Sequence, residues 1–117
     1  MVILYGIKTC DTCRNALKWL DSEGIAHRYH DFRADGLDEA TLSRWLAAVG
    51  WETLLNRRGT TWRGLSDQEK DSIDESRAAA LMLARPALIK RPVFDLGGTF
   101  VVGFADKEKE RLRAQGR

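Results

Sequence analysis

The chain has 117 residues, a length that fits a single domain with one hydrophobic core. Apolar residues make up 44% and charged residues 31%, which is typical of globular proteins and excludes disordered, collagen-like and low-complexity chains. The formal net charge of +2 does not suggest a protein that coats nucleic acid or an anionic membrane.

The cysteines and the N-terminus bear on the compartment. Two cysteines, Cys10 and Cys13, are too few for a secreted disulfide scaffold. No apolar run approaches the roughly 20 residues that cross a membrane. The apolar start, residues 1–5, is too short for a signal peptide and has no basic segment before it. We therefore expect a cytoplasmic protein with reduced thiols and no membrane contact.

The first third of the chain predicts a βαβ unit. Residues 2–5 are an apolar, β-rich run, and residues 25–32 alternate in a polar strand expected near a sheet edge. Between them, residues 9–23 have the spacing of an amphipathic helix that ends at Gly24. The apolar stripe of this helix is Cys13, Ala16, Leu17 and Leu20. Such a unit implies two parallel strands joined by a right-handed crossover.

The middle of the chain, residues 37–85, predicts an all-helical block. Asp38 can cap a helix that Gly50 closes, and Ser66 with Glu69 forms a capping box. Other expected segments are a helical turn at 51–55, a polar basic loop at 56–61, and a helix at 75–84 capped by Asp74.

The last third predicts an antiparallel hairpin and a charged helix. Residues 93–95 and 99–102 are β-type runs separated by Gly97 and Gly98, and residues 106–114 are helical. The order βαβ, helices, ββα is the α/β plan of thioredoxin and glutaredoxin. We expect one such domain over residues 1–117, with the helical block inserted between its halves.

A C-x-x-C motif, Cys10 to Cys13, lies at the junction of the first strand and helix. A helix N-terminus stabilises a thiolate, so Cys10 is the predicted nucleophile. Cys13 lies within one turn and is a candidate resolving thiol; alternatively, it is a small buried residue of the apolar stripe. Arg14 follows and could add positive charge.

The histidines suggest a zinc site that the geometry disfavours. Cys10, Cys13, His27 and His30 form C-x2-C-x13-H-x2-H, with the histidine spacing one residue short of the usual minimum. Histidines three apart on a strand point to opposite faces. We therefore expect no metal ion. We expect no bound organic cofactor either, because a thiol can carry the chemistry by itself.

Arg91 precedes Pro92 immediately before the third predicted strand, where the thioredoxin plan has a cis-proline beside the cysteine loop. Because cis bonds are accessible mainly before proline, we predict a cis Arg91–Pro92 bond. Arg91 would then lie beside Cys10 and could bind an anionic substrate group or stabilise the thiolate. The alternative is an ordinary surface arginine.

A second basic cluster contains Arg57 and Arg58. The chain has 13 Arg against 6 Lys, and arginine suits bidentate capture of carboxylates and oxyanions. The cluster is either an anion-binding loop over the cysteine or a solvated loop. Trp51 and Trp62, on either side of it, are expected in the core of the helical block.

Four segments, residues 4–12, 54–62, 79–82 and 89–92, resemble the arsenate reductase/Spx family and specifically its YffB-like branch. The resemblance covers essentially the whole chain. It implies a thioredoxin-like fold with a helical insertion and a nucleophile at Cys10. It also implies a glutathione-dependent thiol reductase, with glutathione as thiol co-substrate and glutaredoxin as a candidate partner.

Two departures from the family pattern matter. Arsenate reductases of this type carry further arginines around the oxyanion, and the matching positions here fall on Asn56 and near Phe104. The resemblance therefore does not predict efficient arsenate reduction. Cys13 with Arg14 instead resembles the C-x-x-C-R of Spx, a redox-sensing regulator that binds RNA polymerase.

Together these observations predict a thiol-dependent oxidoreductase. The Cys10 thiolate attacks a disulfide or oxidised substrate, and glutathione or Cys13 resolves the adduct. The residues expected to bind glutathione or an anionic substrate are Arg91, Pro92, Arg58, Arg57 and Arg14. The alternatives are an Spx-like regulator that contacts the RNA polymerase α subunit and an arsenate reductase proper. We expect a monomer that binds no nucleic acid.

Overall fold

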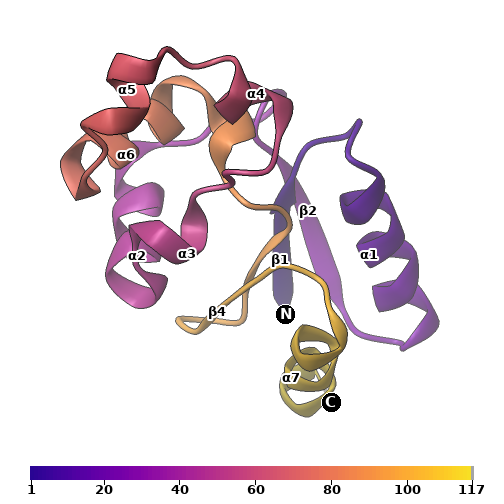
Figure 1. Cartoon of the computed structure of the whole chain (residues 1–117). Helices are drawn as coiled ribbons and strands as arrows, with labels where there is room; N and C mark the ends of the chain where they lie inside the picture. Colours follow the sequence, from indigo (N-terminus) through magenta and orange to yellow (C-terminus); the bar gives the residue numbers. More distant parts are fainter. Residues whose placement is uncertain (117) are drawn as a thin grey trace. The chain divides into compact units, whose positions relative to one another are not determined.

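The computed structural model describes residues 1–116, and the chain divides into two compact units. The sheet unit consists of Met1–Gly36 and the chain from Arg91 onward, and the helical unit is Leu37–Lys90. Figure 1 shows both units, with colours that follow the chain from indigo at the N-terminus to yellow at the C-terminus. The α/β part and the helical part of the sequence thus form separate sets of internal contacts.

The sheet unit contains a four-stranded sheet in the order β2-β1-β3-β4. Its strands are β1 (Val2–Gly6), β2 (His27–Asp31), β3 (Val93–Asp95) and β4 (Phe100–Val102). The pair β1–β2 is parallel, and β1–β3 and β3–β4 are antiparallel. Helix α1 (Asp11–Ser22) connects β1 to β2, and α7 (Asp106–Gly116) follows β4. This arrangement confirms the predicted thioredoxin-like βαβ and ββα halves, with β2 at the edge.

One hydrophobic core packs α1 and α7 against the sheet. Val2 and Leu4 alternate along β1 with the period of a strand, and Ala16 and Leu20 of α1 pack in the same cluster. The buried members are Val2, Leu4, Ala16, Leu20, Ile25, Phe94, Val101 and Leu112. Burial of a large apolar side chain stabilises a fold by about 1.5–3 kcal/mol. The core therefore holds firmly the elements on both sides of the cysteine loop.

Helix α1 and strand β2 each begin two residues later than predicted. Helix α1 begins at Asp11 instead of residue 9, because Cys10 is its N-cap residue with extended backbone angles, φ −83° and ψ 119°. Strand β2 begins at His27 instead of residue 25, since the Ile25 N–H still bonds the Leu20 carbonyl at 3.0 Å. Cys10 therefore stands at the very start of the helix.

The helical unit is built from short helices with local caps. They are α2 (Glu39–Val49), α3 (Trp51–Leu54), α4 (Thr60–Arg63), α5 (Asp67–Asp71), α6 (Glu75–Ala84) and the 3-10 helix η1 (Pro86–Leu88). Asp38 accepts from the Thr41 N–H, Asp74 accepts from the Arg77 N–H, and Ser66 forms the predicted capping box. Within residues 1–116, every helix is too short or too polar to cross a membrane.

The prediction of a loop at residues 56–61 is partly wrong, because α4 already begins at Thr60. Threonine is a weak helix former, so this single turn has no clear signal in the sequence. The end of the helical unit is tied back to its middle: the Asn56 N–H donates to the Leu88 carbonyl, and the Lys90 N–H donates to the Leu54 carbonyl, both at 2.7 Å. These bonds explain why the unit extends to Lys90.

Candidate active site

Cys10 is placed by the loop that joins β1 to α1. Its backbone N–H donates to the Ile7 carbonyl at 3.0 Å, and its own carbonyl accepts the Arg14 N–H at 3.0 Å as the first bond of the helix. The Cys10 side chain is half-buried. A thiol at this position faces the first-turn N–H groups, where a helix stabilises negative charge.

The surroundings of Cys10 favour its thiolate. Burial by itself would raise the pKa of Cys10, but three hydrogen bonds outweigh it and the pKa is lowered. These bonds come from the Cys13 backbone N–H, the Arg91 guanidinium and the Cys13 thiol, and the charge of Arg91 adds to them. A thiolate is the nucleophilic form of cysteine, so Cys10 has the environment of a reactive thiol.

Cys13 has the opposite character. It is only 1% exposed, and burial is the largest cause that raises its pKa to about 12. The interaction with Cys10 raises it further, against a hydrogen bond from the Ile7 backbone. The side chain packs so tightly on Gly6 that a Cβ there would lie 2.5 Å from the Cys13 sulfur. Gly6 is a residue of the site that sequence reasoning missed, because it reads simply as the end of a strand.

Arg91 belongs to the sheet unit and lies near both cysteines. The Arg91–Pro92 peptide bond is cis, as predicted. The half-buried guanidinium reaches the Cys10 sulfur and carries the charge that favours its ionised form. The structure thus brings together three of the predicted site residues, Cys10, Cys13 and Arg91, and places Pro92 immediately before β3.

Arg14 points elsewhere. Its guanidinium forms an ion pair with Asp11 one turn earlier, and both side chains are exposed. The groups that lower the pKa of Cys10 belong to Cys13 and Arg91. An exposed pair of this kind contributes little to stability.

Arg57 and Arg58 belong to the helical unit. A surface pocket of about 330 Å³ is lined there by Glu52, Leu55, Asn56, Arg57, Arg58 and Lys90. The Arg57 guanidinium lies over the rings of Trp51 and Trp62, 5.4 and 5.8 Å from their centroids. The expectation that both tryptophans are core residues is wrong: each is half-buried and forms a face on which Arg57 stacks.

The position after the hairpin is filled by aromatic packing. Phe104 makes an edge contact with Trp19, with ring centroids 5.5 Å apart, and a tilted contact with Phe94 at 6.2 Å. The Lys109 ammonium lies 4.8 Å from the centroid of the Phe104 ring. Phe104 is therefore anchored to the sheet unit and presents no hydrogen-bond donor.

The two histidines make local contacts. His27 Nδ1 donates to the Ile25 carbonyl at 2.9 Å. The His30 ring makes a tilted contact with Tyr5, with centroids 4.8 Å apart, and its Nε2 donates to the Gly36 carbonyl at 2.6 Å. Among residues 1–116, no group of three or more His, Cys, Asp or Glu side chains is arranged to hold a metal ion.

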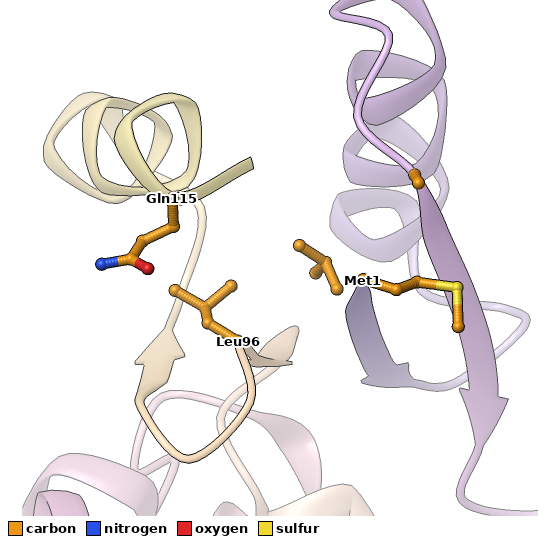
Figure 2. A pocket seen from close by; sticks show the side chains of 5 residues that line it. Met1, Leu96 and Gln115 are labelled. Carbon is orange, nitrogen blue, oxygen red and sulfur yellow. The ribbon is translucent and has the colours of Figure 1, made fainter. Parts of the chain in front are cut away.

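The sheet unit contains a pocket of about 110 Å³ that is not lined by thiols or ionisable side chains. Figure 2 shows Met1, Leu96 and Gln115 around it, with Val2 and Ala26 completing the lining. None of these five side chains is a thiol, an acid or a base. The cysteine loop is therefore the stronger candidate for a reactive centre.

The chain is similar to known proteins in both sequence and structure. The model of the ArsC family matches residues 5–112. A protein of Haemophilus influenzae is 45% identical over 108 residues, which cover 92% of this chain and 95% of that protein. The global transcriptional regulator Spx of Streptococcus mutans is 26% identical over 110 residues, 92% of this chain and 80% of Spx. A solved YFFB protein is 46% identical, superposes with a TM-score of 0.91 and is covered completely by this chain.

Proposed function

This chain belongs to the ArsC family of thiol-dependent oxidoreductase-like proteins, and we propose that it is a glutathione-dependent reductase whose nucleophile is Cys10. The proposal is carried by one observation: Cys10, at the start of α1, has a lowered pKa because Cys13 and Arg91 donate to its sulfur. This arrangement increases the fraction of Cys10 present as the thiolate, the form that attacks an oxidised substrate.

The reaction proceeds by three thiol–disulfide exchanges. The Cys10 thiolate attacks one sulfur of a disulfide substrate, a Cys10 mixed disulfide forms, and the other sulfur leaves as a thiolate. A glutathione thiolate then attacks the substrate sulfur of that mixed disulfide. The Cys10 thiolate is regenerated, and the substrate leaves as a mixed disulfide with glutathione. A second glutathione releases the reduced substrate and forms oxidised glutathione, so two electrons pass from two glutathione molecules to the disulfide.

Glutathione is a better resolving thiol than Cys13. With a pKa of about 12, caused first by burial, Cys13 is protonated almost completely at neutral pH. Resolution requires a thiolate, and burial of Cys13 disfavours that form. The buried thiol instead fills space against Gly6 and donates to Cys10.

Basic side chains suit the two carboxylates of glutathione. Arg91 reaches the Cys10 sulfur, and we propose that it also binds an anionic group of the bound thiol. Arg57, Arg58 and Lys90 line the pocket of the helical unit, which also contains Glu52. The basic lining of this pocket by itself suits carboxylates, because arginine binds carboxylates bidentately. Glutaredoxin remains the proposed protein partner.

Arsenate reduction is the weaker alternative. A tetrahedral oxyanion needs several converging donors, and Phe104 and Asn56 stand where reductases of this type have arginines. Phe104 is packed against Trp19 and Phe94, which supports weak or absent turnover of arsenate. Efficient arsenate turnover that Cys10→Ser and Arg91→Ala both abolish would reverse this ranking.

The similarity to Spx supports a second candidate, a redox-sensing regulator in which Cys10 and Cys13 form a switch. The C-x-x-C-R motif ending at Arg14 favours it, whereas the buried, protonated state of Cys13 disfavours it. A pulldown with the RNA polymerase α subunit separates the two: specific retention supports the regulator, and none is expected for the reductase.

Mass spectrometry after incubation with oxidised glutathione tests the main proposal. We expect one glutathione on Cys10 in the wild type and in Cys13→Ser, and none on Cys13 in Cys10→Ser. Adding reduced glutathione should remove the adduct in both proteins that form it. A wild-type protein that forms no adduct, or forms it on Cys13, would contradict the proposal.

A further inference from the structure

A buried carboxylate at the end of β2 is saturated with hydrogen bonds. Asp31 is 6% exposed. Its Oδ1 accepts the N–H groups of Arg33 and Ala34, at 2.7 and 3.0 Å. Its Oδ2 accepts the Tyr29 hydroxyl at 2.7 Å and the Lys8 backbone N–H at 2.8 Å. The first two bonds shape a local turn, whereas the bond to Lys8 joins residues 23 positions apart.

Asp31 stays ionised in this setting. Burial alone would raise its pKa, but the hydrogen bonds from Tyr29, Ala34, Arg33 and Lys8 outweigh it and lower the pKa to about 2. Hydrogen bonds to a charged acceptor are stronger and more directional than neutral ones. The Lys8 N–H is therefore held by a permanent carboxylate. A second carboxylate lies nearby: Oδ2 of Asp35 accepts the Asp31 backbone N–H at 3.0 Å.

The peptide group between Ile7 and Lys8 connects this carboxylate to the cysteine loop. Its N–H donates to Asp31, and its carbonyl, on Ile7, accepts the backbone N–H of Cys10 at 3.0 Å. A peptide group is planar, so fixing its N–H also fixes the direction of its carbonyl. The Phe32 N–H adds a second tie, to the Gly6 carbonyl at 2.9 Å. The end of β2 thus holds the backbone of residues 6–8, which leads from β1 to Cys10.

We propose that Asp31 is a positioning residue for Cys10: by holding the Ile7–Lys8 peptide, it keeps the Cys10 backbone at the start of α1, where the sulfur meets its donors. The inference rests on the proposed role of Cys10 as nucleophile. Asp31 does not act by its charge, because a nearby negative charge disfavours a thiolate. Positioning and charge therefore predict opposite consequences when Asp31 is removed.

The test is a titration of both thiols by NMR of ¹³Cβ-labelled cysteine in the full chain. We compare the wild type with Asp31→Ala, which removes all the acceptors, and with Asp31→Asn, which keeps the shape and weakens the bond to Lys8. If Asp31 positions the loop, the pKa of Cys10 rises in Asp31→Ala and, by less, in Asp31→Asn. We expect roughly threefold slower alkylation of Cys10 at neutral pH in Asp31→Ala, equivalent to about 0.7 kcal/mol at ~1.4 kcal/mol per decade.

Asp95→Ala is the matched control. Asp95 is also a buried carboxylate at the end of a strand, 8% exposed, and accepts the N–H groups of Gly97 and Gly98 at 2.8 and 3.2 Å. It caps the β3–β4 turn, so its loss should reduce stability without moving the pKa of Cys10. All titrations are made at temperatures where each variant is folded. If Asp31→Ala does not fold, the direction observed in Asp31→Asn decides.

Each result separates the inference from the proposed function. A rise in the pKa of Cys10 in the Asp31 variants, but not in Asp95→Ala, supports positioning. A fall, or no change, overturns the positioning role while leaving the nucleophile intact. A wild-type Cys10 that titrates like a free thiol, near ~8.5, overturns the proposed function itself.

Discussion

The sheet unit and the helical unit are stabilised in different ways and carry different chemistry. The sheet unit holds both thiols and the described buried carboxylates, and it depends on contacts between distant residues, such as Lys8 with Asp31. The helical unit depends on local caps, such as Asp38 and Asp74, and displays arginines around an open pocket. A reactive thiol needs a preorganised environment, whereas charge for binding can be carried on locally determined turns.

The largest expected effect tests whether reactivity belongs to Cys10 alone. Cys10→Ser should abolish reduction of a glutathione mixed disulfide, since no other group in the loop supplies a thiolate. Cys13→Ser should keep most of the activity, because glutathione can resolve the adduct. The measurement is the initial rate with glutathione and glutaredoxin supplied. Activity that survives in Cys10→Ser but not in Cys13→Ser would exchange the roles of the two thiols.

The next prediction compares one glycine in each unit. Gly6→Ala places a Cβ 2.5 Å from the Cys13 sulfur, in a buried site, and should lower the free energy of unfolding by about 1–3 kcal/mol. In the helical unit, a Cβ at Gly64 would lie 3.4 Å from the Thr60 carbonyl oxygen, so Gly64→Ala should change stability by no more than about 1 kcal/mol. Urea unfolding of both variants measures the difference. Equal effects would mean that the Cys13 site is not tightly packed.

Acid should weaken the sheet unit through Asp31. Its pKa is about 2 in the folded chain, despite burial, because of four hydrogen bonds, and is ~3.9 when unfolded. A depressed carboxyl pKa contributes stability that is present above ~3.9 and is lost as the pH falls through about 2, in total about 2 kcal/mol. Urea unfolding between pH 7 and pH 2.5 should show this loss in the wild type. Asp31→Asn should remove this part of the pH dependence, and an unchanged slope would contradict the assignment.

The smallest expected effect compares one arginine from each unit. Arg91→Ala removes a charged donor from the Cys10 sulfur and should slow alkylation of Cys10 at pH 7 by about tenfold, the value of one charged hydrogen bond of ~1.5 kcal/mol. Arg57→Ala should leave the alkylation rate unchanged and weaken binding of S-methylglutathione. Iodoacetamide kinetics and calorimetry give the two readouts. An alkylation rate that falls equally in both variants would remove the distinction between thiol activation and ligand binding.

Local signals account for what could be predicted about the fold. The caps at Asp38, Ser66 and Asp74 could be predicted from the sequence, because a cap and its partner lie within four residues. The turn at Thr60 was missed, since two threonines carry no helix signal. Arg91 was predicted beside Cys10 from its place before a proline and a strand. Gly6 and Asp31 were missed because their site partners are distant in sequence or not marked by any motif.

The sequence by itself determined the order of the elements, the capped helices and the placement of a C-x-x-C motif at a strand-to-helix junction. Tertiary structure decided how different the surroundings of the two thiols are. Cys10 and Cys13 are the same residue type in one motif, yet the Cys13 backbone N–H and Arg91 lower the pKa of Cys10 against the effect of burial, while burial raises the pKa of Cys13. Ionisation depends on solvation and on neighbouring charges, and these are set by which distant residues the fold brings to each sulfur.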